Sequence, residues 1–178
     1  AGGDILIVAG YLDKGGKGII QASLDAGSFK TFFLPDGMIG DSLPTAIGDD
    51  LNGSIGTVPG TDSPGATKFN EIAKSNNFKA GPYTKESYDS AALIMLAMQA
   101  ANSTNSNDFK SKVMDVANAP GEKIFPGELA KGLKLLSEGK EIDYVGASAV
   151  ELIGGGESAG NFAEILIDNQ KVTTVGYK

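Results

Sequence analysis

The first sixty residues alternate short apolar runs with longer amphipathic stretches. Runs rich in apolar residues occupy 5–9 (ILIVA), 31–34 (TFFL) and 53–58 (GSIGTV), and each is followed directly by Gly or Pro. Continuous runs of this length are typical of strands that are buried on both faces of a parallel sheet. Between them, 17–26 and 42–48 carry helical spacing. The order of strand and helix signals predicts an α/β fold built on a parallel sheet.

The middle of the chain is helical and almost free of strand signals. The spacing predicts four helices, over 64–76, 84–101, 108–118 and 126–138. The predicted N-caps are Ser42 for the short helix at 42–48, Ser63 for the helix at 64–76 and Thr84 for the helix at 84–101.

The long helix at 84–101 has an unusual pattern. Its residues Ala91 to Met98 are apolar on every side, so the helix requires cover on more than one face. No neighbouring strand is predicted that could supply the second cover. A sheet that covers the second face of this helix is then expected outside the helical middle of the chain. The alternative is that Ala and Met pack the helix into a tight helical bundle. The acids Glu86 and Asp89 lie near the start of this helix, and we interpret them as favourable to the helix dipole.

The last part of the chain returns to strands. They are predicted at 144–153, 162–167 and 171–177, with a hairpin turn at Asp168–Lys171 between the last two. The glycine-rich stretch 154–160 (GGGESAG) is interpreted as a flexible joint.

The composition excludes several classes of function. The chain has no cysteine and no histidine, which excludes thiol nucleophiles, disulfide frameworks, zinc ribbons and Ser-His-Asp triads. The formal net charge is −7, which argues against nucleic acid as a partner. No apolar run reaches the roughly 20 residues of a membrane span. The sequence predicts no cofactor and no metal site.

Candidate binding residues follow the first two strands. Tyr11 follows the first strand and its closing Gly10, and Asp36 follows the second strand in Leu34-Pro35-Asp36-Gly37. Ligands of open α/β sheets bind at the carboxyl ends of the strands. A carboxylate suits an ammonium group and an aromatic ring suits an apolar side chain, although Asp-Gly is also a common turn pair. The segment Gly10–Gly18 lacks the Gly-Lys-Ser/Thr of a phosphate loop, so no nucleotide is expected there.

Five segments together resemble one known family. They are AGYLDKGGKGIIQASLDAG (9–27), FLPDGMIGDSL (33–43), GTVPGTDSPGATKFN (56–70), PYTKESYDSAALIMLAMQAA (82–101) and YVGASAVELIGGGESAGNFAEILI (144–167). Their order and spacing are similar to those of the leucine/isoleucine/valine-binding proteins, which are type I periplasmic solute-binding proteins of ABC transporters. The resemblance covers almost the whole chain.

The resemblance implies a doubly wound fold of which this chain holds a part. Family members have two α/β lobes joined by hinge strands and are about twice this length, so the chain is similar to their C-terminal half. Residues 1–57 and 161–178 would form lobe two, and 58–160 the helical part of lobe one. The hinge crossings are expected near 58–59 and 154–160. The missing N-terminal half would supply most of the lobe-one sheet, and pairing with it or self-association is expected to cover the long helix.

The resemblance also implies a function. The chain would be a periplasmic substrate-binding component that holds a branched-chain or other amino acid, or a related small amide, between its lobes and delivers it to a permease. Gly10, Tyr11 and Asp36 match the ligand-contacting positions, and Asp36 would pair with the α-ammonium group of the ligand. Family members often carry Glu at that position. The alternatives are a ligand-sensing regulatory domain of the same fold and an enzyme that uses Asp36, although no second acid accompanies it at a suitable spacing. The expectation is a binding protein and not an enzyme.

Overall fold

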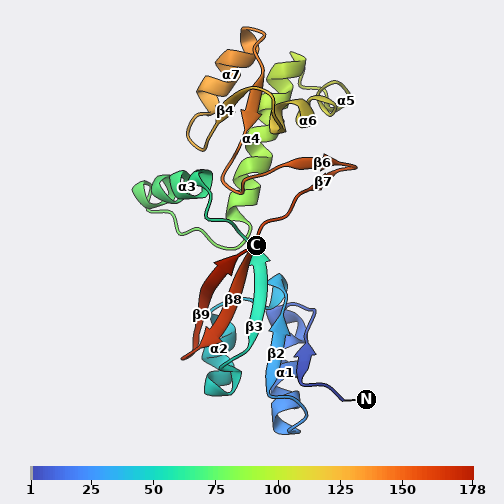
Figure 1. Ribbon diagram of the computed structural model, residues 1–178, viewed down its shortest axis with the longest axis vertical. Helices are drawn as coiled ribbons and strands as arrows, with labels where there is room; N and C mark the ends of the chain where they lie inside the picture. Colours follow the sequence, from blue (N-terminus) through green and yellow to red (C-terminus); the bar gives the residue numbers. More distant parts are fainter. Residues whose placement is uncertain (1) are drawn as a thin grey trace. The chain divides into compact units, whose positions relative to one another are not determined.

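The computed structural model describes residues 2–178 and divides them into two compact units (Figure 1). Unit 1 consists of the residues up to Gly60 together with Phe162–Lys178. Unit 2 is the intervening segment Thr61–Asn161. Each unit has its own core of buried apolar side chains.

Unit 1 is built on a five-stranded sheet. Its strand order is β1 (Ile5–Ile7), β2 (Thr31–Leu34), β3 (Ile55–Pro59), β8 (Phe162–Asp168) and β9 (Lys171–Tyr177). The first three strands are parallel, whereas β8 and β9 are antiparallel to their neighbours. The α/β fold with a parallel sheet that the sequence predicts is therefore confirmed.

Two helices cover one face of this sheet. They are α1 (Lys17–Asp25) and α2 (Ser42–Ile47), which connect β1 to β2 and β2 to β3. Shorter helical turns, Leu12–Gly16, Asp36–Met38 and Gly48–Leu51, complete the connections. Ile20 of α1, Leu43 of α2 and Phe32 of β2 are fully buried in one shared core. The burial of these residues is the main stabilising term for unit 1.

Unit 2 is mostly helical. Its helices are α3 (Pro64–Ser75), α4 (Thr84–Ala101), α5 (Ser106–Phe109), α6 (Lys112–Ala117) and α7 (Leu129–Ser137). Two small sheets accompany them: a parallel pair of β4 (Glu122–Ile124) and β5 (Ile142–Tyr144), and an antiparallel pair of β6 (Leu152–Gly154) and β7 (Glu157–Ser158). The largest buried cluster gathers around α4, α6 and the β4–β5 pair.

Two predicted helices of unit 2 have wrong bounds. The helix expected at 108–118 is two separate helices, α5 and α6, and α5 begins after Asn105, whose side chain accepts the N–H of Asn107 at 2.9 Å. The helix expected at 126–138 begins only at Leu129. Gly127 has φ +86°, which a right-handed helix cannot accommodate.

The predicted strand at 144–153 is also wrong. Only Tyr144 of this range belongs to β5, and the chain re-enters a strand at Leu152. Gly146 and Ala149 take positive φ values of 65° and 54°, which interrupt an extended chain. The predicted flexible joint at 154–160 contains the turn of the β6–β7 hairpin, in which three consecutive glycines have positive φ.

Of the predicted caps, one is confirmed. The Ser63 hydroxyl accepts the N–H of Ala66 at 3.2 Å, and Pro64 occupies the first helical turn. Thr84 does not cap α4, because its hydroxyl is bonded to the N–H and the carbonyl oxygen of Gly81. Ser42 lies inside α2, whose N-terminal flanking residue is Asp41.

One face of α4 is buried and the opposite face is open. Ala92, Leu93, Leu96 and Ala97 are buried, whereas Ile94 and Met95 are 44% and 41% exposed. The helix is apolar on every side, but unit 2 supplies cover for only one of its faces.

Candidate functional site

The candidate site lies where β1 and β2 end. The two strands are parallel neighbours, and Ile7 is paired with Phe33. Gly10 lies three residues after Ile7, and Asp36 lies three residues after Phe33. The strand register therefore brings both residues to the same edge of the sheet. The structure therefore places the three predicted site residues, Gly10, Tyr11 and Asp36, on two adjacent loops of unit 1.

The two loops approach each other closely at Gly37. A Cβ atom added there would lie 2.5 Å from the carbonyl oxygen of Gly10 and 3.0 Å from Cδ1 of Tyr11. The N–H of Gly37 donates to Oδ1 of Asp36 at 2.7 Å. Only glycine permits this approach, and sequence reasoning treated Gly37 merely as a turn residue.

A shallow hollow opens beside the Tyr11 ring. It has a volume of about 520 Å³ and is lined by Tyr11, Leu12, Asp13, Lys14 and Gly37. The chain bends there because the N–H groups of Lys14 and Gly16 both donate to the carbonyl oxygen of Tyr11 at 3.1 Å. The Tyr11 side chain is 69% exposed, so its ring is available to a ligand.

The two acids of this region differ in their surroundings. Asp13 pairs with Nζ of Lys17 at 3.0 Å, one helical turn along the chain. The Asp36 carboxylate instead accepts a hydrogen bond from the Gly37 N–H, and Asp36 lies just after the carboxyl end of β2. Of the two carboxylates, Asp36 lies on the loop that contacts Gly10 and Tyr11.

Replacing Gly37 with alanine is expected to separate the two loops. The added methyl group would collide with the Gly10 backbone, which cannot rotate away as a flexible side chain could. We expect a loss of stability of about 1–3 kcal/mol, as for overpacking in a tight site. Gly10→Ala is the matched control, because its Cβ would meet only the Met38 sulfur at 3.9 Å. Urea unfolding measures both variants, and equal effects would contradict the close approach.

A second cluster of polar groups lies inside unit 2, around Asp89 of α4. The Asp89 side chain accepts from the Tyr144 hydroxyl at 2.8 Å, from the Ala147 N–H at 2.7 Å, and from the N–H and hydroxyl of Ser148 at 2.7 and 2.6 Å. Asp89 is only 2% exposed. The interpretation of Asp89 as an acid whose role is to favour the helix dipole is therefore wrong. Its carboxylate anchors the loop that follows β5.

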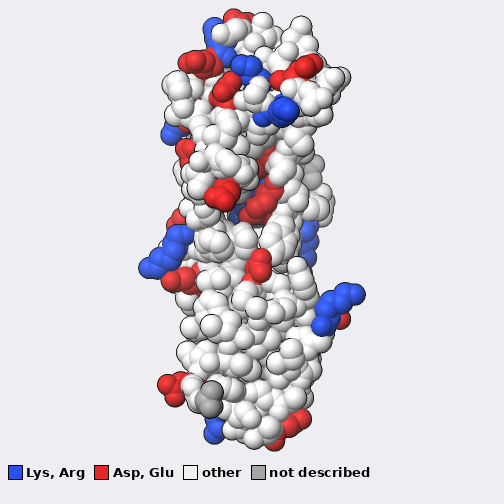
Figure 2. All heavy atoms as spheres, turned by 90° about the vertical axis from the view of Figure 1, so that its right-hand side faces the viewer, with Lys and Arg blue, Asp and Glu red and all other residues white. Residues whose placement is uncertain are grey.

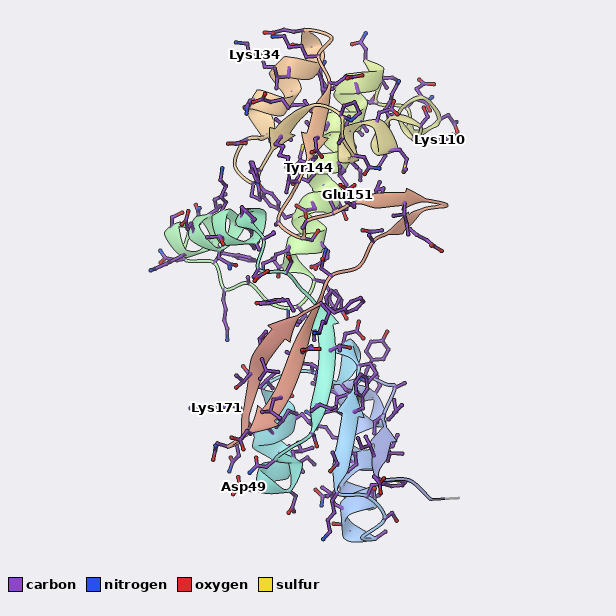
Figure 3. The ribbon with its side chains drawn as sticks, viewed as in Figure 1. Asp49, Lys110, Lys134, Tyr144, Glu151 and Lys171 are labelled. Atoms are coloured by element: carbon purple, nitrogen blue, oxygen red, sulfur yellow. The ribbon has the colours of Figure 1, made fainter. Side chains whose placement is uncertain are left out.

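The pKa of Tyr144, which is labelled in unit 2 in Figure 3, reflects this arrangement. Burial raises the pKa of its hydroxyl well above the ordinary value, and the neighbouring Asp89 carboxylate raises it further. Tyr144 thus stays protonated and donates its hydrogen bond throughout the physiological pH range. The cluster is a structural anchor with its polar groups satisfied, and it leaves no open position for a ligand.

Glu128 makes the stability of unit 2 depend on pH. The N–H of Phe125 donates to its carboxylate at 3.0 Å, which lowers the Glu128 pKa, and the cations of Lys68 and Lys131 lower it further. A lowered pKa in the folded state means that the stabilisation is present at neutral pH and is lost as the pH falls through the folded value. The unmodified protein is expected to lose thermal stability as the pH falls from 6 to below the usual carboxylate pKa. In Glu128→Gln the melting temperature is expected to fall less over the same pH range. An unchanged profile would contradict this assignment.

Residues 2–178 were also searched for a metal site and for a membrane-spanning helix. Within that range no group of three or more acidic side chains is placed to hold a metal ion. None of the helices described there is both long and apolar enough to cross a membrane.

Comparison with known proteins decides the fold. No protein-family model matches the chain. The leucine-binding protein LivK of Thermotoga maritima superposes with a TM-score of 0.71 at 17% identity, over 98% of this chain and 44% of that protein. The chain has the fold of a type I periplasmic solute-binding protein. A second solute-binding protein of this type, the R. palustris ABC transporter protein in complex with 4-hydroxybenzoate, gives a TM-score of 0.64 at 15% identity, over 99% of this chain and 45% of that one.

One curated protein is also similar to this chain in sequence. It is the substrate-binding protein BasB of the chemotactic signal transduction system in Halobacterium salinarum, with 28% identity over 97 residues. The match covers 54% of this chain and 24% of BasB, and the chain spans less than half of each matched structure. The matched proteins are a leucine-binding protein, a solute-binding protein and a substrate-binding protein.

Proposed function

We propose that this chain is part of the substrate-binding component of an ABC transporter and that its ligand is an amino acid or a related small amide. The matched structures are solute-binding proteins, and one of them is a leucine-binding protein. Under this proposal the full protein works in the periplasm and delivers its ligand to a transporter permease. Unit 1 would represent most of one lobe and unit 2 the helical part of the other.

The observation that carries this proposal is the contact between Gly37 and the Gly10–Tyr11 loop. It brings a carboxylate and an aromatic ring to the same strand ends, where α/β folds bind their ligands. The Asp36 carboxylate would accept a charge-assisted hydrogen bond from the α-ammonium group, which is a stronger bond than one between neutral groups. The exposed Tyr11 ring would pack against the apolar part of the ligand.

The carboxylate of the proposed ligand would need a cation or hydrogen-bond donors as its partner. Lys14 lines the hollow, whereas Lys17 is already paired with Asp13. The groups that bind the carboxylate would come from the part of the protein that lies outside these residues. Binding by the 178-residue chain alone is then expected to be weak.

The similarity to BasB supports a second candidate. BasB is a substrate-binding protein of a chemotactic signalling system, so a chain similar to it could report ligand binding to a signalling partner and not to a permease. Both candidates use the same ligand-binding step. A permease gene or a transducer gene beside this one would distinguish them.

The test is calorimetric titration of the protein encoded by the complete reading frame with a panel of amino acids and small amides. Asp36→Asn is expected to weaken binding of the best ligand by about 10- to 100-fold, the usual worth of a hydrogen bond to a charged group. Asp13→Asn is the matched control, since this acid lies on the same hollow but pairs with Lys17. Equal effects of the two substitutions, or no binding by any member of the panel, would contradict the proposal.

A further inference from the structure

Two segments of the chain carry the acceptor motif for N-linked glycosylation. The motif is Asn, then any residue except Pro, then Ser or Thr. It occurs at Asn52-Gly53-Ser54 in unit 1 and at Asn102-Ser103-Thr104 in unit 2. The proposed ligand site uses neither segment. The structure distinguishes the two motifs, because only one of them presents both its amide and its hydroxyl to solvent.

The motif in unit 1 is closed. Ser54 is fully buried, and its hydroxyl accepts the N–H of Phe32 at 3.3 Å. The backbone around it is also held in the sheet. The N–H of Gly53 donates to the carbonyl oxygen of Ile167 at 2.9 Å, and the N–H of Ile167 donates to the carbonyl oxygen of Ser54 at 2.8 Å. An enzyme that recognises the hydroxyl of the motif therefore cannot reach Ser54 in the folded unit.

The motif in unit 2 is open. Asn102 follows the last residue of α4, and both Asn102 and Thr104 are exposed. Among the residues that the structure describes, neither of these two side chains has a hydrogen-bond partner. Ser103 between them fixes the turn, since its hydroxyl donates to Oδ2 of Asp108 at 2.7 Å and accepts the N–H of Asn105 at 3.1 Å. The loop thus has a defined shape while the acceptor amide and the hydroxyl stay free.

The backbone at Asn102 explains only part of this motif. Its φ is +48°, and its N–H donates to the carbonyl oxygen of Gln99 at 3.1 Å, which is a common way for a helix to end. Asparagine tolerates this left-handed conformation better than most residues. The end of the helix therefore accounts for asparagine at position 102, but it does not require a hydroxyl at position 104.

There is room for a sugar beside the acceptor. A hollow of about 540 Å³ adjoins it and is lined by Met95, Met98, Gln99, Asn102, Ser103 and Thr104. α4 ends close to α5 (Figure 1). The side of unit 2 on which α5 lies faces the viewer in Figure 2 and carries charged side chains of both signs, as is typical of a solvated surface. A bulky hydrophilic group suits such a surface.

We propose that Asn102 is an acceptor of N-linked glycosylation and that Asn52 is not. The donor is an oligosaccharide carried on a polyprenyl phosphate or diphosphate. Nδ2 of Asn102 forms a bond to the anomeric carbon of the sugar, and the bond from that carbon to the lipid phosphate oxygen breaks. Nδ2 loses one proton as the lipid phosphate leaves. This assignment rests on the proposed function in one respect only, namely that the protein is exported to the compartment where such donors are used.

The test is the mass of two peptides of the protein isolated from the cells that encode it. Cleavage after lysine separates the motifs, because it yields residues 31–68 with Asn52 and residues 86–110 with Asn102. We expect hexose or N-acetylhexosamine increments on the peptide 86–110, assigned to Asn102 by fragmentation, and an unmodified peptide 31–68. An unmodified Asn102, or a glycan on Asn52, would overturn the proposal.

Variants produced in the same cells separate glycosylation from other adducts. Thr104→Val and Asn102→Gly should each remove the increment completely, whereas Thr104→Ser keeps the motif and should retain it. Glycine suits the left-handed backbone at position 102, so Asn102→Gly is expected to fold as the unmodified protein does, which circular dichroism checks. An increment on Asn102 that survives in Thr104→Val would also overturn the proposal. None of these measurements involves ligand binding, so their failure is distinct from failure of the proposed function.

Discussion

Asp89→Ala is expected to lower the free energy of unfolding of unit 2 by about 3–5 kcal/mol, because each buried donor that loses its acceptor costs about 1–3 kcal/mol. The substitution removes the shared acceptor of the Tyr144 hydroxyl and of the Ala147 and Ser148 N–H groups. Water cannot replace it easily, since Asp89 and Tyr144 are only 2% and 1% exposed. The loop after β5 should lose its position.

The matched control for Asp89 is Tyr144→Phe. It removes one of the hydrogen bonds and leaves the carboxylate bonded to the loop, so a loss of about 1 kcal/mol is expected. Urea unfolding followed by far-ultraviolet circular dichroism measures both variants, and amide exchange in α4 assigns the loss to unit 2. A loss for Asp89→Ala no larger than that for Tyr144→Phe would contradict the role of Asp89 as the anchor.

Gly65→Val is expected to destabilise unit 2 by about 3 kcal/mol or more, the upper part of the range for overpacking a tight site. Even a Cβ atom at Gly65 would overlap the carbonyl oxygen of Gly146. That carbonyl cannot retreat freely, because Gly146 has φ +65° and its own Cα faces the Asp89 carboxylate. The first turn of α3 would have to move away from the loop after β5.

Gly18 provides the control for Gly65. It lies in α1, where an added Cβ would meet no atom within 4 Å. Gly18→Ala is therefore expected to be neutral or to stabilise unit 1 by up to about 1 kcal/mol, through the higher helix propensity of alanine. Thermal unfolding of Gly65→Ala, Gly65→Val and Gly18→Ala should give a graded loss in the first two and none in the third. Tolerance of valine at Gly65 would contradict the observed packing.

The strands β1, β2 and β3 of unit 1 could be predicted from the sequence because each lies in a short run rich in apolar residues that is followed by Gly or Pro. The pattern in unit 2 was less informative for a physical reason. β4 has three residues, two of them charged, and it becomes a strand only because β5 pairs with it from twenty residues away. The breaks at Gly127 and Gly146 depend on positive φ values that the sequence permits but does not require.

The candidate site was predictable for a different reason. Parallel pairing of two adjacent strands necessarily brings Tyr11 and Asp36 to one edge, so the pattern of strands was sufficient. The close approach at Gly37 depends on the loop conformations and was not predictable. Asp89 was misinterpreted, although a signal existed. It is spaced three, four and seven residues before Ala92, Leu93 and Leu96, which places it on the buried stripe of α4.

The most direct test of the proposed function is to map the ligand on the isotopically labelled protein encoded by the complete reading frame. Backbone amide shifts are followed while an amino acid selected from the panel is titrated. The account predicts that the largest shift changes in unit 1 occur at Gly10, Tyr11 and Gly37, and that Asp36→Asn reduces them. Shift changes concentrated elsewhere, for example at the apolar hollow formed by Phe69, Phe78 and Tyr88 in unit 2, would contradict it.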